Sequence, residues 1–383
     1  ICDFLWFGFV PSHAIAEKRY RYLADLAEDP TIDTFSHKSH GSADELLRHI
    51  IADLTAGLDT VVIPLSAGKD SRGLLGAALK VLDQEQIHTY TFGHPGVDDY
   101  ERVRALIGGQ VRNHTLVDIT RAEADYSDAK ILRMLHERST GTPRQISNYM
   151  GMNLEKELAH LPAGPHLNGF LGDSLSGKKL PDPLSGRWRE AVERFVRRNR
   201  AFMGRIDLTP PDYDPTDALP RTALGDSPHI TFDDQLDWCF RQEQRIRGEA
   251  TVNLLRPYED PRWIASFLRA PMAARFKQKF YTAFLARSYP EIFPDLQQDA
   301  ASSSVPNALT EKGEGKEGSH ISTTMHFDLD HLYERNTSFS NFCRKNVGDL
   351  QERGVIDWLD LNAVIAEADR DPKGLGRPLF ILS

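Results

Sequence analysis

Cysteine is scarce in this sequence. The 383-residue chain has three, Cys2, Cys239 and Cys343, which are far apart and form no C-x-x-C pair. An odd number of scattered cysteines gives no disulfide framework, and a zinc site needs closely spaced thiol or imidazole ligands. We therefore expect three ordinary thiols and no structural zinc.

Long hydrophobic runs are also missing. No stretch approaches the roughly 20 apolar residues that cross a bilayer. The N-terminal residues are too acidic and aromatic for a signal peptide. The sequence thus predicts a cytoplasmic protein with no membrane partner.

Positive charge is in deficit. The chain has 46 Lys and Arg against 55 Asp and Glu, a formal net charge of −9, which opposes nonspecific binding to nucleic acid. Residues 187–205 are locally rich in arginine. Their apolar members Trp188, Ala191, Val192, Phe195 and Phe202 recur at helical spacing, so the arginines fit the solvated face of a helix. An acidic substrate is the alternative ligand for that face.

Two common nucleotide-binding loops are absent. A P-loop needs Gly five positions before its Gly-Lys pair and Ser or Thr directly after it, but these positions hold Ile63 and Asp70. The dinucleotide pattern G-x-G-x-x-G is missing as well. What is present is a short loop of small and polar residues, Ser66-Ala67-Gly68-Lys69-Asp70-Ser71-Arg72, here called the 66–72 loop.

The 66–72 loop lies between an apolar run at 61–65 and an apolar helical pattern at 74–79. Amide groups at such a strand-to-helix turn point into one concavity, and the helix dipole adds roughly half a positive charge there. The position predicts an anion site that fits a pyrophosphate. The alternative is an ordinary turn in which Asp70 caps the helix.

Apolar periodicity around this loop indicates an α/β fold. The predicted elements are helix 44–54 capped by Ser42, strands 61–65, 87–92 and 111–117, and helix 98–107. Alternating strands and helices predict a doubly wound parallel sheet, whose ligands bind beyond the C-terminal strand ends. The 66–72 loop falls at such an end.

The rest of the chain is predicted to be largely helical. Expected elements are helical pattern at 121–161, a strand over 166–171 that leads into Gly172–Gly177, and helices at 187–205, 233–250 and 261–289, with a proline-rich stretch at 206–220. Residues 301–319 have few apolar side chains, which favours either a mobile connector or an active-site flap.

Five segments, taken in order, resemble one family. They are Asp3–Pro11, the 66–72 loop, Thr91–Gly93, Gly169–Asp173 and Arg256–Asp260. Together they resemble the synthetase domain of asparagine synthetase B, a branch of the PP-loop ATP pyrophosphatases that includes β-lactam synthetases and lasso-peptide macrolactam cyclases. The loop resembles the family signature Ser-Gly-Gly-x-Asp-Ser, with Ala67 in place of one Gly. The resemblance implies a ligase domain over 56–383 and a linker segment over 1–55.

The family resemblance also implies a reaction and its cofactors, ATP and magnesium. A carboxylate is adenylated, pyrophosphate is released and an amine attacks the acyl-adenylate. Asp70 and Asp173 resemble the magnesium ligands, and carboxylates with phosphate oxygens suit Mg²⁺. Ser66, Gly68, Asp70 and Ser71 resemble the pyrophosphate cradle, and Ile63 with Phe92 would flank adenine. The full ATP-binding set that the resemblance implies is Ile63, Leu65, Ser66, Ala67, Gly68, Lys69, Asp70, Ser71, Arg72, Phe92, Gly169, Phe170 and Gly172.

Cations are expected beside the phosphates. The family uses a lysine on a late loop to stabilise the transition state, and Lys312 is the nearest match, with Lys316 and Lys279 as competitors. Lys69 and Arg72 lie in the loop itself and would add electrostatic help.

Two departures from the family bear on function. Phe170 stands where asparagine synthetase has a Glu and β-lactam synthetase a Tyr, and it cannot accept a proton. The base is left open among Tyr149, His136 and the carboxylates of Glu259 and Asp260. The 66–72 loop also begins too early for a glutaminase domain to precede it within this sequence, so Cys2 is not expected to be a glutaminase nucleophile.

These features favour an ATP- and magnesium-dependent amide ligase of specialised metabolism, such as a peptide macrolactam cyclase. Its substrate would be a small-molecule or peptide carboxylate. The sequence leaves open whether a partner supplies the substrate or ammonia and whether the protein forms a homodimer. The alternatives are asparagine synthetase itself and a nucleotide-binding partner protein without ligase activity. Modification of tRNA is disfavoured by the net charge and by the lack of paired cysteines.

Overall fold

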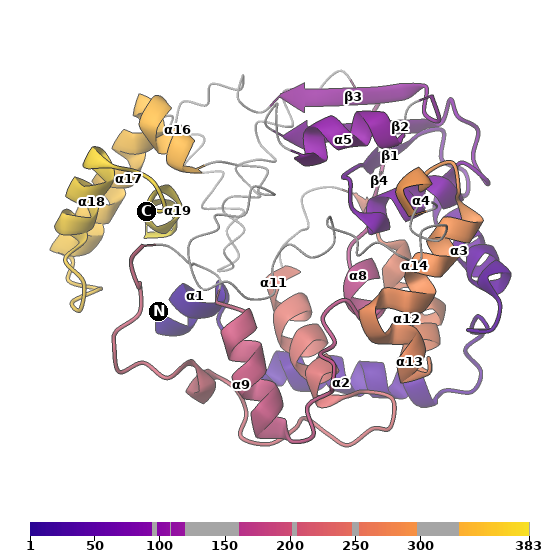
Figure 1. The fold of residues 1–383 in the computed structure, drawn as a ribbon, viewed down its shortest axis with the longest axis horizontal. Coiled ribbons are helices and arrows are strands. Elements are labelled where there is room, and N and C mark those ends of the chain that lie inside the picture. The colour runs from indigo at the N-terminus through magenta and orange to yellow at the C-terminus, as the bar shows by residue number, and fades with distance from the viewer. Residues whose placement is uncertain are drawn as a thin grey trace, which may run out of the picture.

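The strands that the structure describes form one five-stranded sheet. The computed structural model describes residues 1–93, 98–107, 109–118, 161–200, 205–246, 253–296 and 329–382. The strands are β1 (Val61–Pro64), β2 (Ile87–Gly93), β3 (Asn113–Asp118), β4 (His166–Leu167) and β5 (Leu254–Leu255). Every pairing is parallel, in the order β3-β2-β1-β4-β5. Figure 1 labels the first four of these. The predicted α/β class with a parallel sheet is confirmed.

The strand order reverses direction at β1. From β1 the chain moves outward through β2 and β3, and it then returns to the other side of β1 as β4. In register, Ile63 lies beside Thr89 of β2, whereas Val62 lies beside His166 of β4. The loops that follow β1 and β4 therefore diverge above a topological switch point, where open parallel sheets bind their ligands.

Three helices precede the sheet: α1 (Cys2–Phe7), α2 (His13–Glu28) and α3 (His40–Thr55). Their buried residues, such as Phe7, Leu23 and Leu47, belong to the same apolar cluster as the strand residue Ile63. Residues 1–55, expected as a linker segment, thus contribute to the folded core, and the expected boundary falls between α3 and β1.

The expected cap of α3 was wrong by three residues. The N-cap is Ser39, whose side chain accepts a hydrogen bond from the backbone N–H of Ser42. The helix therefore begins earlier than the apolar pattern of 44–54 indicated, because its polar first turn carries no periodic signal.

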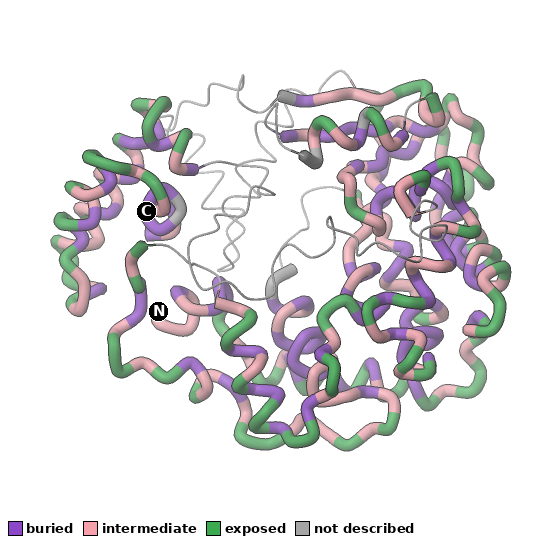
Figure 2. The backbone as a smooth tube through the Cα atoms, in the orientation of Figure 1, coloured by how far each residue is buried: buried purple, intermediate pink, exposed green. Residues whose placement is uncertain are grey.

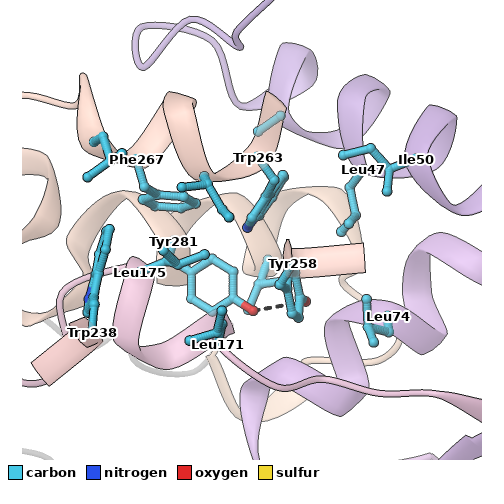
Figure 3. Packing of buried hydrophobic residues seen from close by; sticks show 14 of the residues in the cluster. Leu47, Ile50, Leu74, Leu171, Leu175, Trp238, Tyr258, Trp263, Phe267 and Tyr281 are labelled. Carbon is cyan, nitrogen blue, oxygen red and sulfur yellow. Dashed lines mark hydrogen bonds between the residues drawn. The ribbon is translucent and has the colours of Figure 1, made fainter. Parts of the chain in front are cut away.

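A group of helices packs into the same apolar cluster as β1. It contains α4 (Lys69–Ala78), α12 (Pro261–Leu268), α13 (Met272–Arg275) and α14 (Lys279–Ser288). Figure 3 shows Trp263, Phe267 and Tyr281 of this group packed with Leu47 of α3 and Leu74 of α4. The predicted single helix over 261–289 is wrong: Pro271 follows α12, and Lys277 and Gln278 have positive φ before α14. Proline cannot continue a helix, and left-handed residues reverse its path.

The segment from β4 to β5 is helical but irregular. It contains α8 (Gly172–Leu175), α9 (Trp188–Arg198), α10 (Phe232–Asp234), a π-helix over Gln235–Gln242 and α11 (Glu243–Ile246), with a 3-10 turn at Pro215–Ala218. Two further 3-10 turns, Pro257–Glu259 and Phe276–Gln278, follow β5. The predicted strand over 166–171 is too long, because Leu171 adopts φ 73° and turns the chain into α8. The predicted amphipathic helix is confirmed for α9, which ends earlier than expected, at Arg198.

A second helical unit lies at the C-terminal end, formed by α16 (Leu329–Arg335), α17 (Thr337–Glu352), α18 (Leu361–Arg370) and α19 (Gly376–Leu382). It has its own apolar cluster, to which Leu5 of α1 and Leu208 also belong. Buried and exposed positions alternate along these helices (Figure 2). The expected helical stretch 121–161 and loop 301–319 lie outside the described residues, except for Leu161. In the part of the chain that the structure describes, no helix is long and apolar enough to cross a membrane.

Candidate functional site

The turn between β1 and α4 is closed by its serines. The Ser66 amide donates to Ser71 Oγ across 3.1 Å, and the Gly68 amide donates to Ser66 Oγ across 3.2 Å. Gly68 is the N-cap of α4, and no side chain caps this helix. The first-turn amides of α4 therefore have no side-chain acceptor and offer a site for an anion.

Asp70 does not serve as the helix cap that the ordinary-turn alternative required. Its Oδ2 accepts a hydrogen bond from the backbone N–H of Asp173 across 3.1 Å, and its Oδ1 accepts one from the hydroxyl of Tyr281 across 2.9 Å. The structure thus brings together the two aspartates that were predicted as magnesium ligands, although 103 residues separate them in sequence.

Two glycines allow the starts of α4 and α8 to meet. A Cβ atom on Gly172 would lie 2.6 Å from Asp70 Oδ1, and one on Gly169 would lie 3.0 Å from the Ser71 amide nitrogen. Both distances are shorter than ordinary van der Waals contact, so larger residues would separate the helices. Gly169 and Gly172, assigned to the ATP site from the resemblance, therefore have a packing role beside Asp70.

Behind Asp70 lies a pair of fully buried tyrosines. Tyr258 donates its hydroxyl proton to the backbone carbonyl of Asp70 across 3.1 Å, and the two tyrosine hydroxyls are 3.0 Å apart (Figure 3). Sequence reasoning missed both as site residues. Tyr258 could have been found through its place in the 256–260 motif, whereas nothing near Tyr281 in sequence marks it.

The helix α14 contacts three parts of the site. Gln278 donates to Ser176 Oγ across 2.6 Å, Tyr281 binds Asp70, and Thr282 accepts from Lys69 Nζ across 2.9 Å. Gln278 follows Lys277, and both are non-glycine residues with positive φ. Such conformations cost of order 1–3 kcal/mol each and persist where surrounding contacts impose them. The hydrogen bond from Gln278 to Ser176 is one of the contacts that hold this conformation.

The pKa values of the two aspartates are shifted in opposite directions. Burial raises the pKa of Asp70 to about 7, and the charge of Asp173 adds to the rise. Burial also works against the Asp173 charge, but Lys178 at 3.1 Å, with Lys179 and Arg241 near it, outweighs this effect and lowers the pKa of Asp173. A divalent cation between the carboxylates would favour the ionised form of both. The donor set fits Mg²⁺ for this reason.

The two cations of the 66–72 loop, Lys69 and Arg72, have different surroundings. Lys69 is close to Asp70, and burial lowers the pKa of its ammonium group. Arg72 is 2% exposed and forms a two-pronged ion pair with Asp295, at 2.8 and 3.0 Å, over the ring of Phe293. Lys69 therefore lies within the site. The charge of Arg72 is already balanced by Asp295.

Further lysines that the sequence did not single out lie near Asp173. Lys178 forms the ion pair with its carboxylate, and Lys179 follows on the surface. Their only local signal was the Gly177-Lys178-Lys179 sequence after the predicted strand. They add positive charge beside Asp173.

The residues predicted to flank adenine are not brought together. Ile63 is fully buried in the main apolar cluster, whereas Phe92 packs against the small cluster of Val62 and Tyr90. Because successive strand residues point to opposite faces of a sheet, these two side chains lie on different faces. Of the remaining predicted residues, Leu65 is buried, and Ala67 and Phe170 pack against the main cluster.

Some of the candidate bases and late lysines lie among the described residues and others do not. Glu259 is paired with Arg256 at 3.2 Å, and Asp260 is paired with Arg262 at 2.9 Å and caps α12. Lys279 begins α14. His136, Tyr149, Lys312 and Lys316 lie outside the described residues.

Comparison with known families and curated proteins finds no significant match. Among the residues described by the structure, no group of three or more His, Cys, Asp and Glu side chains could hold a metal ion. What the geometry defines is a two-carboxylate site beside an uncapped helix start, at the switch point of a parallel α/β sheet.

Proposed function

We propose that this protein is an ATP- and magnesium-dependent amide ligase of the PP-loop type that forms AMP and pyrophosphate. The observation that carries the proposal is the contact between Asp70 and Asp173 at the sheet switch point. Two carboxylates that converge next to an uncapped helix start suit a polyphosphate with its divalent cation better than they suit a neutral ligand.

Each part of ATP has a suitable partner among these residues. The amides of the 66–72 loop and the start of α4 would hold the β and γ phosphates. Asp70 and Asp173 would hold Mg²⁺, which neutralises phosphate charge and fixes the phosphates in place. Lys69 and Lys178 flank the pair and would balance the remaining negative charge.

The proposed reaction has two steps. A carboxylate oxygen of the substrate attacks the α phosphorus, and pyrophosphate leaves. The nitrogen of an amine then attacks the acyl carbon, and AMP leaves. Phe170 leaves the site without the proton-accepting group expected there for ammonia chemistry, so we favour a peptide or other larger substrate and, in particular, macrolactam formation. We place the reaction in the cytoplasm, where ATP is present.

The test uses the purified chain with ATP and Mg²⁺ and two carboxylate probes. One is L-aspartate with ammonium, and the other is a peptide with a free α-amino group and an Asp or Glu side chain. AMP and pyrophosphate are expected, with amide formation in the peptide. ADP as the main product would refute adenylation. Efficient asparagine formation would favour asparagine synthetase, and ATP binding without pyrophosphate release would favour the non-catalytic alternative.

A further inference from the structure

Amide formation releases a proton, and the described site offers few groups to accept it. Asp70 and Asp173 are committed to the proposed metal. In Glu259 and in Asp260, both carboxylate oxygens face an arginine. Phe170 has no proton-accepting atom. A further buried carboxylate, Asp237, lies close enough to Asp173 for their charges to interact.

Asp237 is held in a π-helix, Gln235–Gln242, which places side chains five residues apart on one face. The amide of Gln242 donates to Ser174 Oγ across 2.7 Å and to Asp237 Oδ1 across 3.5 Å. Ser174 directly follows Asp173. The π-helix thus connects Asp237 to the turn that carries the candidate metal ligand, and π segments are frequent at functional sites.

One oxygen of Asp237 lacks a partner. Arg241 faces Oδ1 at 3.3 Å, but Oδ2 is buried and has no hydrogen bond. A buried carboxylate oxygen without a hydrogen-bond donor costs free energy. Such an atom usually accepts a hydrogen bond from a group outside the protein chain, such as a ligand. The N–H groups of an amine or ammonium are donors of that kind.

The charges around Asp237 suit a proton acceptor. Burial raises the pKa of its carboxyl and the Asp173 charge adds to this, while Arg241 and the Ser174 hydroxyl act in the opposite direction. Lys179 is a second cation whose charge interacts with it. A carboxylate with a raised pKa accepts a proton near neutrality better than an ordinary aspartate does.

We infer that Asp237 forms the amine subsite of the proposed ligase and accepts the proton of the incoming amine at Oδ2. This assignment rests on the proposed function. As the amine nitrogen bonds to the acyl carbon, its N–H bond breaks and the proton passes to Oδ2. The bond from the acyl carbon to the AMP oxygen breaks, and AMP leaves with that electron pair.

The test compares two amines in the Asp237→Asn variant, with L-aspartate and the Asp- or Glu-containing peptide as carboxylate probes. Hydroxylamine is unprotonated near neutral pH and reacts with acyl-adenylates without a strong base. The variant should therefore form hydroxamate at a rate close to that of the unchanged protein, while ligation to ammonium or the peptide amine falls by about 100-fold or more. Hydroxamate formation also shows that the variant is folded and adenylates its substrate.

The matched control is Asp233→Asn, one helical turn earlier, where the carboxylate binds Ser185 and lies near Arg194. It should leave both rates nearly unchanged. Equal losses with hydroxylamine and with amines in Asp237→Asn would mean a structural role and would overturn the assignment, as would no loss at all. Absence of pyrophosphate release by the unchanged protein with every probe would overturn the proposed function itself.

Discussion

Tyr281 donates its hydroxyl proton to Asp70 Oδ1 across 2.9 Å, from the first turn of one helix to the first turn of another. The other oxygen of the same carboxylate is held by the Asp173 amide. Asp70 is therefore fixed at both oxygens before any ligand arrives. Such preorganisation lowers the cost of binding a metal with strict geometric demands.

Removing the Tyr281 hydroxyl should weaken magnesium use. Because a hydrogen bond to a charged group contributes about 1.5–3 kcal/mol, we expect Tyr281→Phe to raise the Mg²⁺ concentration for half-maximal pyrophosphate release by roughly 10-fold or more. The control is Tyr289→Phe, since Tyr289 packs on Gly76 of the same helix as Asp70 but its hydroxyl interacts with Asp44. Equal magnesium curves for the two variants would remove the positioning role from Tyr281.

The two carboxylates should be needed for activity but not for folding. Asp70→Asn and Asp173→Asn keep the shape of each side chain and remove the charge that would bind Mg²⁺. We expect pyrophosphate release to be abolished in each, with a thermal unfolding midpoint close to that of the unchanged protein. Magnesium-dependent turnover that survives in either variant would exclude that residue from the metal site.

Gly172 should not tolerate a side chain. A methyl group there would meet Asp70 and Tyr258 at 2.6 and 2.9 Å, so Gly172→Ala should cost about 1–3 kcal/mol of stability and abolish ATP turnover. Gly348→Ala is the control, because it lies within α17 with nothing in 4 Å of the added atom. The control should be neutral or slightly stabilising. Chemical denaturation measures both, and equal stability of the two variants would contradict the packing.

A half-buried histidine should make stability depend on pH. His37 lies among the rings of Phe35 and Phe280, and its Nε2 is buried without a partner. Burial lowers the pKa of His37; a hydrogen bond with the Ser266 backbone acts in the opposite direction, and the Arg275 charge adds a smaller lowering effect. The unfolded chain therefore binds a proton near pH 6.5 that the folded chain does not. Stability should be complete above pH 6.5 and decline as the pH falls below it.

Replacing that histidine should reduce the acid sensitivity. Urea denaturation at pH 7.5 and pH 5.5 is the measurement, and His37→Phe should show a smaller difference between the two than the unchanged protein. His49→Gln, at an exposed position of α3, should keep the full difference. An unaltered difference in His37→Phe would assign the acid sensitivity to other groups.

The sequence predicted those parts of the fold that depend on local pattern. The strands at 61–65, 87–92 and 111–117 and the helix at 98–107 are present within a few residues, because buried parallel strands leave continuous apolar runs. The two-residue β4 and the π-helix were not predicted. Neither follows from periodicity: Leu171 turns the chain through a left-handed conformation, and a π segment needs tertiary contacts.

For the candidate site, the sequence predicted which residues take part but not which side chains contact one another. The motifs placed Asp70 and Asp173 at neighbouring strand ends, where the structure has them. Tyr281 and the pairing of Arg72 with Asp295 could not be predicted, since each partner lies more than 200 residues away in sequence. Lys312 lies outside the described residues, so its role stays a prediction.

The position of α14 has a consequence for how the protein folds. Its contacts to Lys69 and Asp70 close loops of 213 and 211 residues, and the Asp173 contact closes one of 103. Contacts of such high sequence separation form late, because loop-closure entropy must be overcome first. An unfinished chain released before residue 279 would lack the hydroxyl that holds Asp70. If the chain binds ATP as proposed, the nucleotide stabilises only chains that are complete through α14.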